Sequence, residues 1–342
     1  MKIGIVGYQG SGKSTLFEWL TGEKADPSRS HLDQSAMAPV PDERIAQLCE
    51  IYQPKKVTQA SLEIVDTPGL NRTHEGNPAR LGLIREAGCM VIVVGAYDGA
   101  DPVADLQRFE DDLLLADLDI VSGRVERLRE SVKKPRPNRD EEIAELEALE
   151  PLVAILESGR QLSEEGLTRE QQKATRSFRL LTEKPRLIVV NVADDETEGE
   201  KYVEAIKEKG PAVAIAVGLE LELARMSEED RNELIADMEL QPADRDALLR
   251  QMLDVSNQMI YFTAGEKEVR TWMLHQGGTA LEAADNIHSD LARGFIRAEV
   301  MKCSDLIRLG GERELKAQNL VSQEPKDYIV TSDDVINIKF SV

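Results

Sequence analysis

One stretch of the sequence decides how this chain is interpreted: Gly7-Tyr8-Gln9-Gly10-Ser11-Gly12-Lys13-Ser14. It fits the pattern G-x-x-x-x-G-K-[ST], which is known as the Walker A pattern. The apolar residues 2–6 before it are typical of a short buried strand, and residues 15–20 after it have helical spacing. Glycines let such a loop direct its backbone N–H groups at phosphate oxygens, and the helix N-terminus adds positive potential. The sequence therefore predicts a nucleoside triphosphate site.

The side chains that follow the loop have expected roles at such a site. The Lys13 ammonium would reach the β- and γ-phosphate oxygens, and the Ser14 hydroxyl would bind Mg²⁺. Because the loop surrounds the phosphates, we expect ligand contacts from Gly7, Gly10, Ser11, Gly12, Lys13, Ser14 and Thr15.

Composition limits the functional classes that remain. The chain has 342 residues, enough for two or three domains with cores of their own. Its 42 Lys and Arg against 63 Asp and Glu give a net charge of −21, which repels nucleic acid unless one face is locally basic. The widely spaced Cys49, Cys89 and Cys303 are interpreted as reduced packing residues. No apolar run reaches transmembrane length and a strand begins at once, so we expect a cytoplasmic protein without signal peptide or membrane partner.

Apolar runs typical of strands alternate with helical patterns in much of the chain. Most of these runs are rich in β-branched residues and lack clean alternation, as strands buried on both faces of a parallel sheet do. The predicted fold class is therefore α/β with right-handed crossovers. The runs are residues 2–6, 62–65, 90–94, 187–192 and 212–217.

Two segments depart from this alternation. Between about residues 102 and 183, apolar residues recur at helical spacing on both sides of a Pro-containing break at residues 133–138, which predicts an inserted antiparallel helical hairpin. From about residue 256, short apolar runs predict a small mixed domain. These runs are residues 260–263, 271–274, 296–300, 328–331 and 335–340. The predicted domains are residues 1–101 with 184–255, residues 102–183, and residues 256–342.

A second candidate element of the site is Asp66-Thr67-Pro68-Gly69, which follows the second predicted strand. In a Walker-type NTPase this position supplies an acidic residue to the magnesium shell and a glycine N–H to the γ-phosphate. A carboxylate suits Mg²⁺, which prefers hard oxygen ligands and retains several waters. We therefore expect Asp66 and Gly69 to act with Lys13 in catalysis.

The residue after Gly69 bears on the rate of hydrolysis. Many GTPases place a water-orienting glutamine there, whereas this chain has Leu70, which forms no hydrogen bond to water. His74 lies four residues further on and could orient water, although a loop histidine is more often only solvated. We expect hydrolysis to be slow.

Base recognition is expected from Asn191-Val192-Ala193-Asp194, which ends a predicted strand where an N-K-x-D motif would stand. An Asp carboxylate at this position accepts the two donors of guanine, a pair that adenine does not offer. Asn191 and Asp194 are therefore candidate base-reading residues, and an ordinary turn at the end of a strand remains the alternative.

These elements, in this order, resemble the YchF-type ATPases related to Obg over nearly the whole chain. The most specific matches are residues 39–44 (PVPDER), 110–118 (EDDLLLADL), 262–272 (FTAGEKEVRTW), 287–290 (IHSD) and 293–300 (RGFIRAEV). The resemblance implies a Ras-like P-loop domain with a parallel-rich sheet, an inserted helical hairpin and a C-terminal α+β TGS domain. It also implies ATP preferred over GTP, leucine in place of the catalytic glutamine, and association with the ribosome.

The chain departs from the family pattern at several positions. Gly10 and Ser11 replace the usual Asn-Val, and Asp194 replaces a glutamate, which makes GTP credible beside ATP. A loop histidine that the family uses in hydrolysis is missing after residues 97–99. Ser30 aligns with the switch I threonine on Mg²⁺, so the implied metal ligands are Ser14, Ser30 and Asp66. The tail lacks two expected cations at Leu320 and Ser322, which removes phosphate contacts.

Three hypotheses follow from the sequence. The leading one is a monomeric, Mg²⁺-dependent NTPase that binds a purine nucleoside triphosphate as a switch for a translation partner such as the ribosome. The second is a nucleotide-binding scaffold that barely hydrolyses. The third is a small-molecule kinase, against which the Asp66–Gly69 motif and the inserted hairpin argue.

Overall fold

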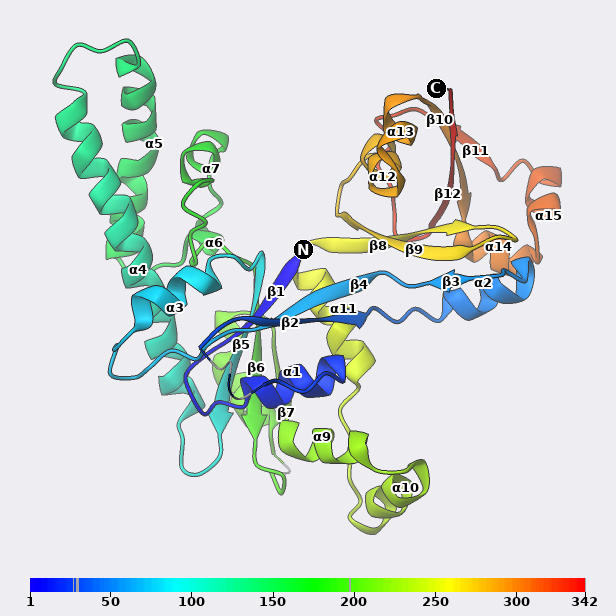
Figure 1. Ribbon diagram of the computed structural model, residues 1–342, viewed down its shortest axis with the longest axis horizontal. Coiled ribbons are helices and arrows are strands. Elements are labelled where there is room, and N and C mark those ends of the chain that lie inside the picture. Colours follow the sequence, from blue (N-terminus) through cyan, green and yellow to red (C-terminus); the bar gives the residue numbers. More distant parts are fainter. Residues whose placement is uncertain (27, 29–30, 197, 342) are drawn as a thin grey trace. The chain divides into compact units, whose positions relative to one another are not determined.

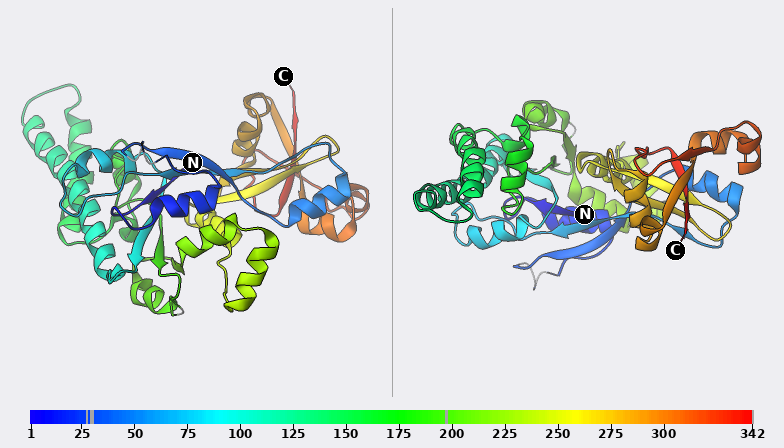
Figure 2. Two further views of the ribbon diagram at one scale, coloured as in Figure 1. Left: turned by 60° about the horizontal axis from the view of Figure 1, so that its bottom comes forward. Right: turned by 90° about the horizontal axis from the view of Figure 1, so that it is seen from above.

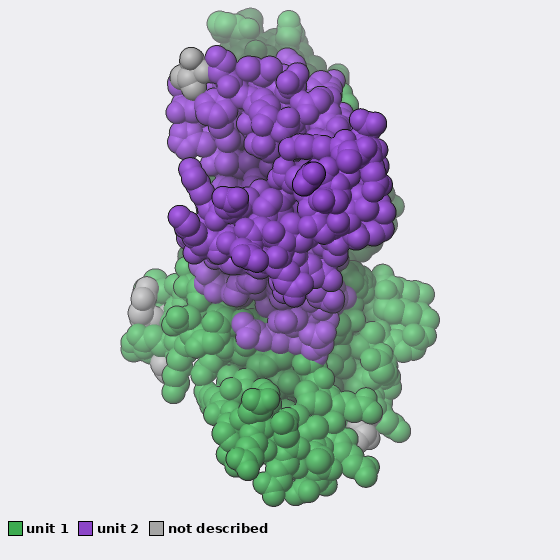
Figure 3. All heavy atoms as spheres, turned by 90° about the vertical axis from the view of Figure 1, so that its right-hand side faces the viewer, with its two compact units in different colours: residues 1–36, 63–243 green, residues 37–62, 244–342 purple. Residues whose placement is uncertain are grey.

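The computed structural model describes residues 1–26, 28, 31–196 and 198–341 (Figure 1). The chain forms two compact units (Figure 3). Met1–Ala36 with Glu63–Ala243 make up the first unit, and Met37–Leu62 with Asp244–Val342 make up the second. The three domains expected from the sequence remain a prediction.

A six-stranded sheet in the order β2-β4-β1-β5-β6-β7 organises the first unit. The pairs β1–β4, β1–β5, β5–β6 and β6–β7 are parallel. Every residue of β5 and β6 is buried, as expected for apolar runs covered on both faces. The bounds are β1 Lys2–Val6, β2 Gln34–Pro39, β4 Ser61–Asp66, β5 Cys89–Ala96, β6 Arg186–Val192 and β7 Ala212–Ile215. The predicted α/β class is confirmed, and the carboxyl ends of β1, β4 and β6 share one edge of the sheet.

Helices connect these strands in the first unit. They are α1 Lys13–Thr21, α3 Asn77–Ile84, α4 Pro102–Ser131, α5 Arg139–Glu157, α6 Leu162–Glu165, α7 Arg169–Thr175, α8 Glu200–Ile206, α9 Val217–Arg225 and α10 Glu228–Asp237, with a 3₁₀ turn at Lys207–Lys209. Phe109 and Leu113 of α4 are fully buried in one core cluster with Ile92 and Ile188 from the central strands. The first turns of α4 are therefore fixed against the sheet.

The predicted helical hairpin is present, and its helices α4 and α5 lie side by side (Figure 2). Asp101 caps α4 by accepting hydrogen bonds from the N–H groups of Val103 and Ala104. Leu128 and Leu149 are buried in the apolar cluster between the helices. The described helices include none with the length and apolarity that a membrane crossing requires.

The second unit contains another six-stranded sheet, in the order β11-β10-β12-β8-β9-β3. Its strands are β3 Val57–Thr58, β8 Gln258–Ala264, β9 Val269–His275, β10 Phe295–Lys302, β11 Ser322–Glu324 and β12 Asp334–Phe340. Its helices are α2 Arg44–Tyr52, α11 Arg245–Val255, α12 Ala280–Ile287, α13 Ser289–Arg293, α14 Cys303–Leu309 and α15 Glu312–Ala317. Arg44 ties the early segment into this unit, because its guanidinium donates to the carbonyl of Ser332 at 2.8 Å and lies over the ring of Phe262.

Some predicted strands differ from the structure. The run at residues 212–217 ends as a strand at Ile215, because Val217 begins α9. Residues 328–331 form no regular strand; Ile329 makes a single bridge to Thr279. The strands β2 and β11 were not predicted, since QSAMAP and SQE lack the β-branched and aromatic residues that indicate a strand.

Candidate nucleotide site

The loop of residues 7–12 joins β1 to α1 and has a backbone path that requires glycine. Gly7 and Gly12 adopt φ angles of +145° and +97°. A Cβ atom on Gly7 would lie 2.4 Å from the carbonyl oxygen of Val93, and one on Gly12 would lie 2.1 Å from Nδ2 of Asn191. Both positions therefore exclude other residues by conformation and by space. Thr15 follows in the first turn of α1, where it is half-buried.

Lys13 is the first residue of α1 and is only 6% exposed. Its Nζ atom donates to the carbonyl oxygen of Tyr8 at 2.7 Å. Burial lowers the pKa of Lys13 to about 8, an effect that the nearby Asp66 carboxylate opposes and the Arg72 guanidinium reinforces. The ammonium is therefore poorly compensated in this state, and an anion beside it would be strongly favoured.

Ser14, in the first turn of α1, meets Asp66 at the carboxyl end of β4, and these two residues are the ones predicted to bind Mg²⁺. The Ser14 hydroxyl donates to Oδ2 of Asp66 at 2.6 Å. The other carboxylate atom, Oδ1, is buried and finds no hydrogen-bond partner among the described residues. Burial raises the pKa of Asp66, because it disfavours the charged form. A hydroxyl beside an unpaired carboxylate oxygen is a donor set that fits Mg²⁺. Ser30, the third implied ligand, lies outside the described residues.

Gly69 and Leu70 dock the loop after β4 onto the residue 7–12 loop. The N–H of Gln9 donates to the carbonyl of Leu70, and the N–H of Leu70 donates to the carbonyl of Gly7, both at 3.0 Å. A Cβ on Gly69 would lie 2.9 Å from the backbone nitrogen of Gln9 and 2.7 Å from Nζ of Lys13, so glycine allows the two loops to approach this closely. The side chain of Leu70 is fully buried in the core. It is thus directed away from any position where a glutamine could orient water.

Two basic side chains of this loop end on carboxylates of α4, which the sequence did not reveal. Nη2 of Arg72 lies 2.5 Å from Oδ2 of Asp105, and Nδ1 of His74 lies 3.1 Å from Oδ1 of Asp112. Tyr8 lies between the two pairs, because its hydroxyl donates to Oδ2 of Asp112 at 2.9 Å and its ring centroid is 5.0 Å from Cζ of Arg72. The contacts join the phosphate loop, the loop after β4 and the base of the hairpin.

The predicted base-reading residues differ in how they are held. Asn191 is 6% exposed; its Nδ2 donates to the carbonyl of Ser11 at 3.1 Å, and its Oδ1 accepts from the N–H of Val217 at 3.1 Å. Asp194 is exposed, and its Oδ1 accepts from the N–H of Leu219 at 3.1 Å. Asn191 thus fastens two loops together, and base contact by either residue stays a prediction.

Tyr97, at the end of β5, is a further residue that the sequence did not indicate. Its hydroxyl donates to the carbonyl of Gly10 and so supports the phosphate loop from the neighbouring strand. In the sequence, residues 97–99 were noted only as the point after which a family loop is missing, and no pattern marked this contact.

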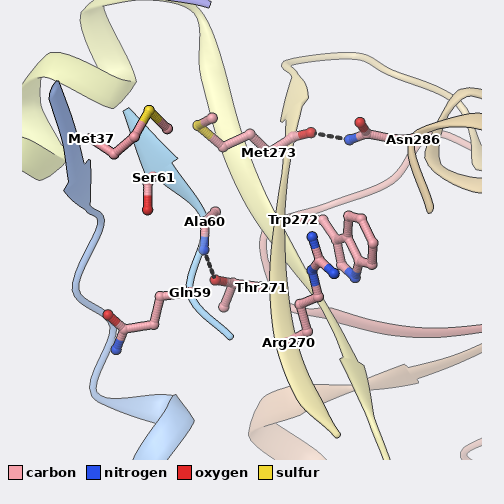
Figure 4. A pocket seen from close by; sticks show the side chains of 9 residues that line it. All are labelled: Met37, Gln59, Ala60, Ser61, Arg270, Thr271, Trp272, Met273 and Asn286. Carbon is pink, nitrogen blue, oxygen red and sulfur yellow. Dashed lines mark hydrogen bonds between the residues drawn. The ribbon is translucent and has the colours of Figure 1, made fainter. Parts of the chain in front are cut away.

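The second unit holds a separate pocket of about 390 Å³ (Figure 4). Two hydrogen bonds join residues that line it: the N–H of Ala60 donates to Oγ1 of Thr271 at 2.8 Å, and Asn286 donates to the carbonyl of Met273. Arg270 stacks on Trp272, with Cζ 3.8 Å from the ring centroid. The pocket is built without the phosphate-binding features of the first unit.

Comparison with known proteins agrees with this geometry. Residues 2–122 match a family model described as 50S ribosome-binding GTPase, and residues 259–341 match the model for the C-terminal part of YchF GTPases, described as a protein of unknown function. The chain is 33% identical to the ribosome-binding ATPase YchF of Haemophilus influenzae, over 100% of this chain and 99% of that protein. It is 32% identical to the protein of that name from Bacillus subtilis, over 99% of both. The solved structure of the Schizosaccharomyces pombe YchF GTPase superposes with a TM-score of 0.84 at 25% identity, covering 99% of this chain and 97% of that one.

Proposed function

The chain belongs to the YchF family of P-loop NTPases, and from that premise we propose that it is a Mg²⁺-dependent purine nucleoside triphosphatase. Its nucleotide state would govern association with the ribosome, which the names of its relatives give as their binding partner. We further propose that the protein acts as a cytoplasmic monomer.

One observation carries the proposal: four groups from two distant segments converge on one point. Lys13 and Ser14 come from the residue 7–14 loop and α1, and Asp66 and Gly69 come from the end of β4 and the loop after it. Lys13 would neutralise the phosphate oxygens, and the N–H of Gly69 would detect the γ-phosphate. Ser14 and Asp66 would hold Mg²⁺, which supplies additional positive charge to the phosphates when bound.

The same geometry supports slow turnover. Leu70 stands where a water-orienting glutamine would stand, and its side chain is buried in the core. GTPases of the Ras type that lack an arginine finger hydrolyse on the order of 10⁻⁴ per second even with the water-orienting glutamine in place. This rate is compatible with a switch that a partner accelerates. A scaffold that does not hydrolyse is the second candidate, because burial of Leu70 would suit it equally.

The test begins with titration of fluorescent ATP and GTP analogues, with Mg²⁺ and with a chelator. We expect Mg²⁺-dependent binding by the natural chain, loss of binding in Lys13→Ala, and unchanged binding in Lys24→Ala, which removes an exposed lysine beyond the far end of α1. Single-turnover hydrolysis of the tighter-binding triphosphate then separates the switch from the scaffold. Failure to bind either analogue would overturn the proposal.

Ribosome association needs its own measurement. We expect the chain to co-sediment with ribosomes more strongly with a non-hydrolysable triphosphate than with the diphosphate. A chain with a net charge of −21 can contact ribosomal phosphates only through a few locally basic residues. The bound fraction should therefore fall only modestly as the salt concentration rises. Equal sedimentation in both nucleotide states would contradict a nucleotide-dependent switch.

A further inference from the structure

Backbone hydrogen bonds hold the loop that contains Arg72 against the phosphate loop. Arg72 lies three residues after Gly69, in the loop that docks on the residue 7–12 loop through the two 3.0 Å hydrogen bonds between Gln9, Leu70 and Gly7. The bridge between Tyr8 and Leu70 extends this pairing in parallel register. Leu70, two residues before Arg72, is therefore paired with the backbone on either side of Tyr8, the residue whose carbonyl accepts from Lys13.

The guanidinium of Arg72 lies on a side chain of the phosphate loop itself. Its Cζ atom is 5.0 Å from the centroid of the Tyr8 ring, and the carbonyl of Tyr8 is the group that accepts from Lys13. Tyr8 is 4% exposed and is held by an edge-to-face contact with Phe109, with centroids 5.6 Å apart, and by its bond to Asp112. Arg72 thus packs on a fixed surface rather than on a mobile one.

Asp105 forms an ion pair with the guanidinium of Arg72. The ion pair joins Nη2 of Arg72 to a carboxylate that is 9% exposed, on the first turn of α4. Half of the Arg72 side chain remains exposed, and a guanidinium has five N–H donors, of which this contact uses one. Arg72 can therefore bind a phosphate oxygen while its bond to Asp105 is retained.

Two other described residues of the loop after β4 do not fit this task. Leu70 is buried, and His74 carries a charge only when protonated, whereas an arginine is always charged. Given the NTPase function proposed above, on which this inference rests, we propose that Arg72 is a catalytic residue that stabilises charge on the γ-phosphate, with Asp105 and Tyr8 positioning its guanidinium.

In this role Arg72 forms and breaks no covalent bond. Water attacks the γ-phosphorus, the bond from that phosphorus to the bridging oxygen breaks, and the bridging oxygen leaves with the electron pair on the diphosphate. The proton of the attacking water passes to the released phosphate or to solvent. The guanidinium stabilises the charge that develops on the phosphate oxygens during this step.

The experiment compares single-turnover hydrolysis and diphosphate affinity in three variants. Arg72→Ala should lower the rate at least about tenfold, since arginine fingers contribute roughly 10³ to 10⁵ in this enzyme class, and Arg72→Lys should retain part of it. Diphosphate affinity and melting temperature should stay within about twofold and about 2 °C of the natural chain. Arg127→Ala, which removes an exposed arginine further along α4, should leave the rate unchanged.

A second readout serves if basal hydrolysis is too slow to compare. Aluminium fluoride with the diphosphate mimics the transferring phosphoryl group, and Arg72→Ala should fail to retain that complex while Arg127→Ala retains it. If Arg72→Ala hydrolyses the triphosphate and retains the aluminium fluoride complex within twofold of the natural chain, the role of Arg72 is overturned, while the proposed NTPase function stands. Parallel losses in rate, diphosphate affinity and melting temperature would show a structural role instead, which also overturns it. If the natural chain binds no nucleotide, the proposed function fails, and this inference fails with it.

Discussion

In the phosphate half of the site, the two charged side chains Lys13 and Asp66 are both buried, whereas in the base half Asn191 is buried and Asp194 is exposed. Lys13 and Asp66 are each 6% exposed, and their partners Tyr8 and Ser14 come from the same loop and helix. In the base half, the side chain of Asn191 forms hydrogen bonds to two loops, while Asp194 is exposed to solvent.

The difference shows that phosphate recognition and base recognition place different requirements on the fold. Phosphate recognition needs an enclosed cation and oriented N–H groups, so its residues lie close together in sequence and in space. Base recognition uses loops that follow separate strands, so a residue there can serve the fold, the ligand or both. The predictions below test how far this division holds.

The largest expected effect is on the phosphate half. Lys13→Ala should weaken triphosphate binding at least about a hundredfold, because it removes the buried cation that would reach both the β- and γ-phosphates. The melting temperature should stay equal or rise, since a buried ammonium is removed from a site that disfavours it. Calorimetric titration and thermal melts would measure both. Unchanged affinity would mean that Lys13 is not the phosphate ligand.

Asp66→Asn should have the next largest effect. It keeps the shape of the side chain but removes its charge, so the gain in triphosphate affinity on adding Mg²⁺ should fall about tenfold to a hundredfold, the value of a hydrogen bond to a charged group. Affinity measured in chelator should change little. An equal Mg²⁺ dependence in this variant and the natural chain would remove Asp66 from the metal site.

A pH titration should produce a smaller change in the same half. Lys13 has a pKa of about 8 in the free protein, and bound phosphate favours its charged form. Triphosphate affinity should therefore be constant below pH 8 and fall as the pH rises through 8, by about tenfold per unit at most. Titrations at pH 7 and pH 9 would measure it. Lys13→Ala should lose this dependence, and a flat profile in the natural chain would contradict the assignment.

The smallest effects are expected in the base half, where they should separate Asn191 from Asp194. Asn191→Ala should destabilise the fold by about 1–3 kcal/mol, because it leaves buried backbone groups of Ser11 and Val217 without partners. Asp194→Asn should leave the melting temperature unchanged and lower any preference for guanine over adenine. Thermal melts with paired ATP and GTP titrations test both predictions. If Asn191→Ala loses base preference without losing stability, Asn191 recognises the base and has no structural role.

Contiguous motifs explain which features could be predicted. The Lys13–Ser14 pair, the α/β class and the hairpin were predicted because each depends on a contiguous pattern. Asp66 lies 52 positions from Ser14 and was predicted only because it belongs to a motif of its own after a predicted strand. The Arg72–Asp105 and His74–Asp112 pairs were not evident, because they join residues 33 and 38 positions apart with no shared periodicity. The strand at Gln34–Pro39 was missed since its composition does not favour strands.

The sequence by itself determined the phosphate loop, since Gly7, Gly10 and Gly12 permit the positive φ angles that the loop needs and other residues rarely adopt. Only the tertiary structure decided which side chains complete the site. Packing α4 against the central strands brings Asp105 and Asp112 to Tyr8, and this fixes Arg72 and His74 beside the loop. Burial also directs Leu70 into the core and sets the pKa of Lys13, because both depend on how much water the folded chain excludes from those positions.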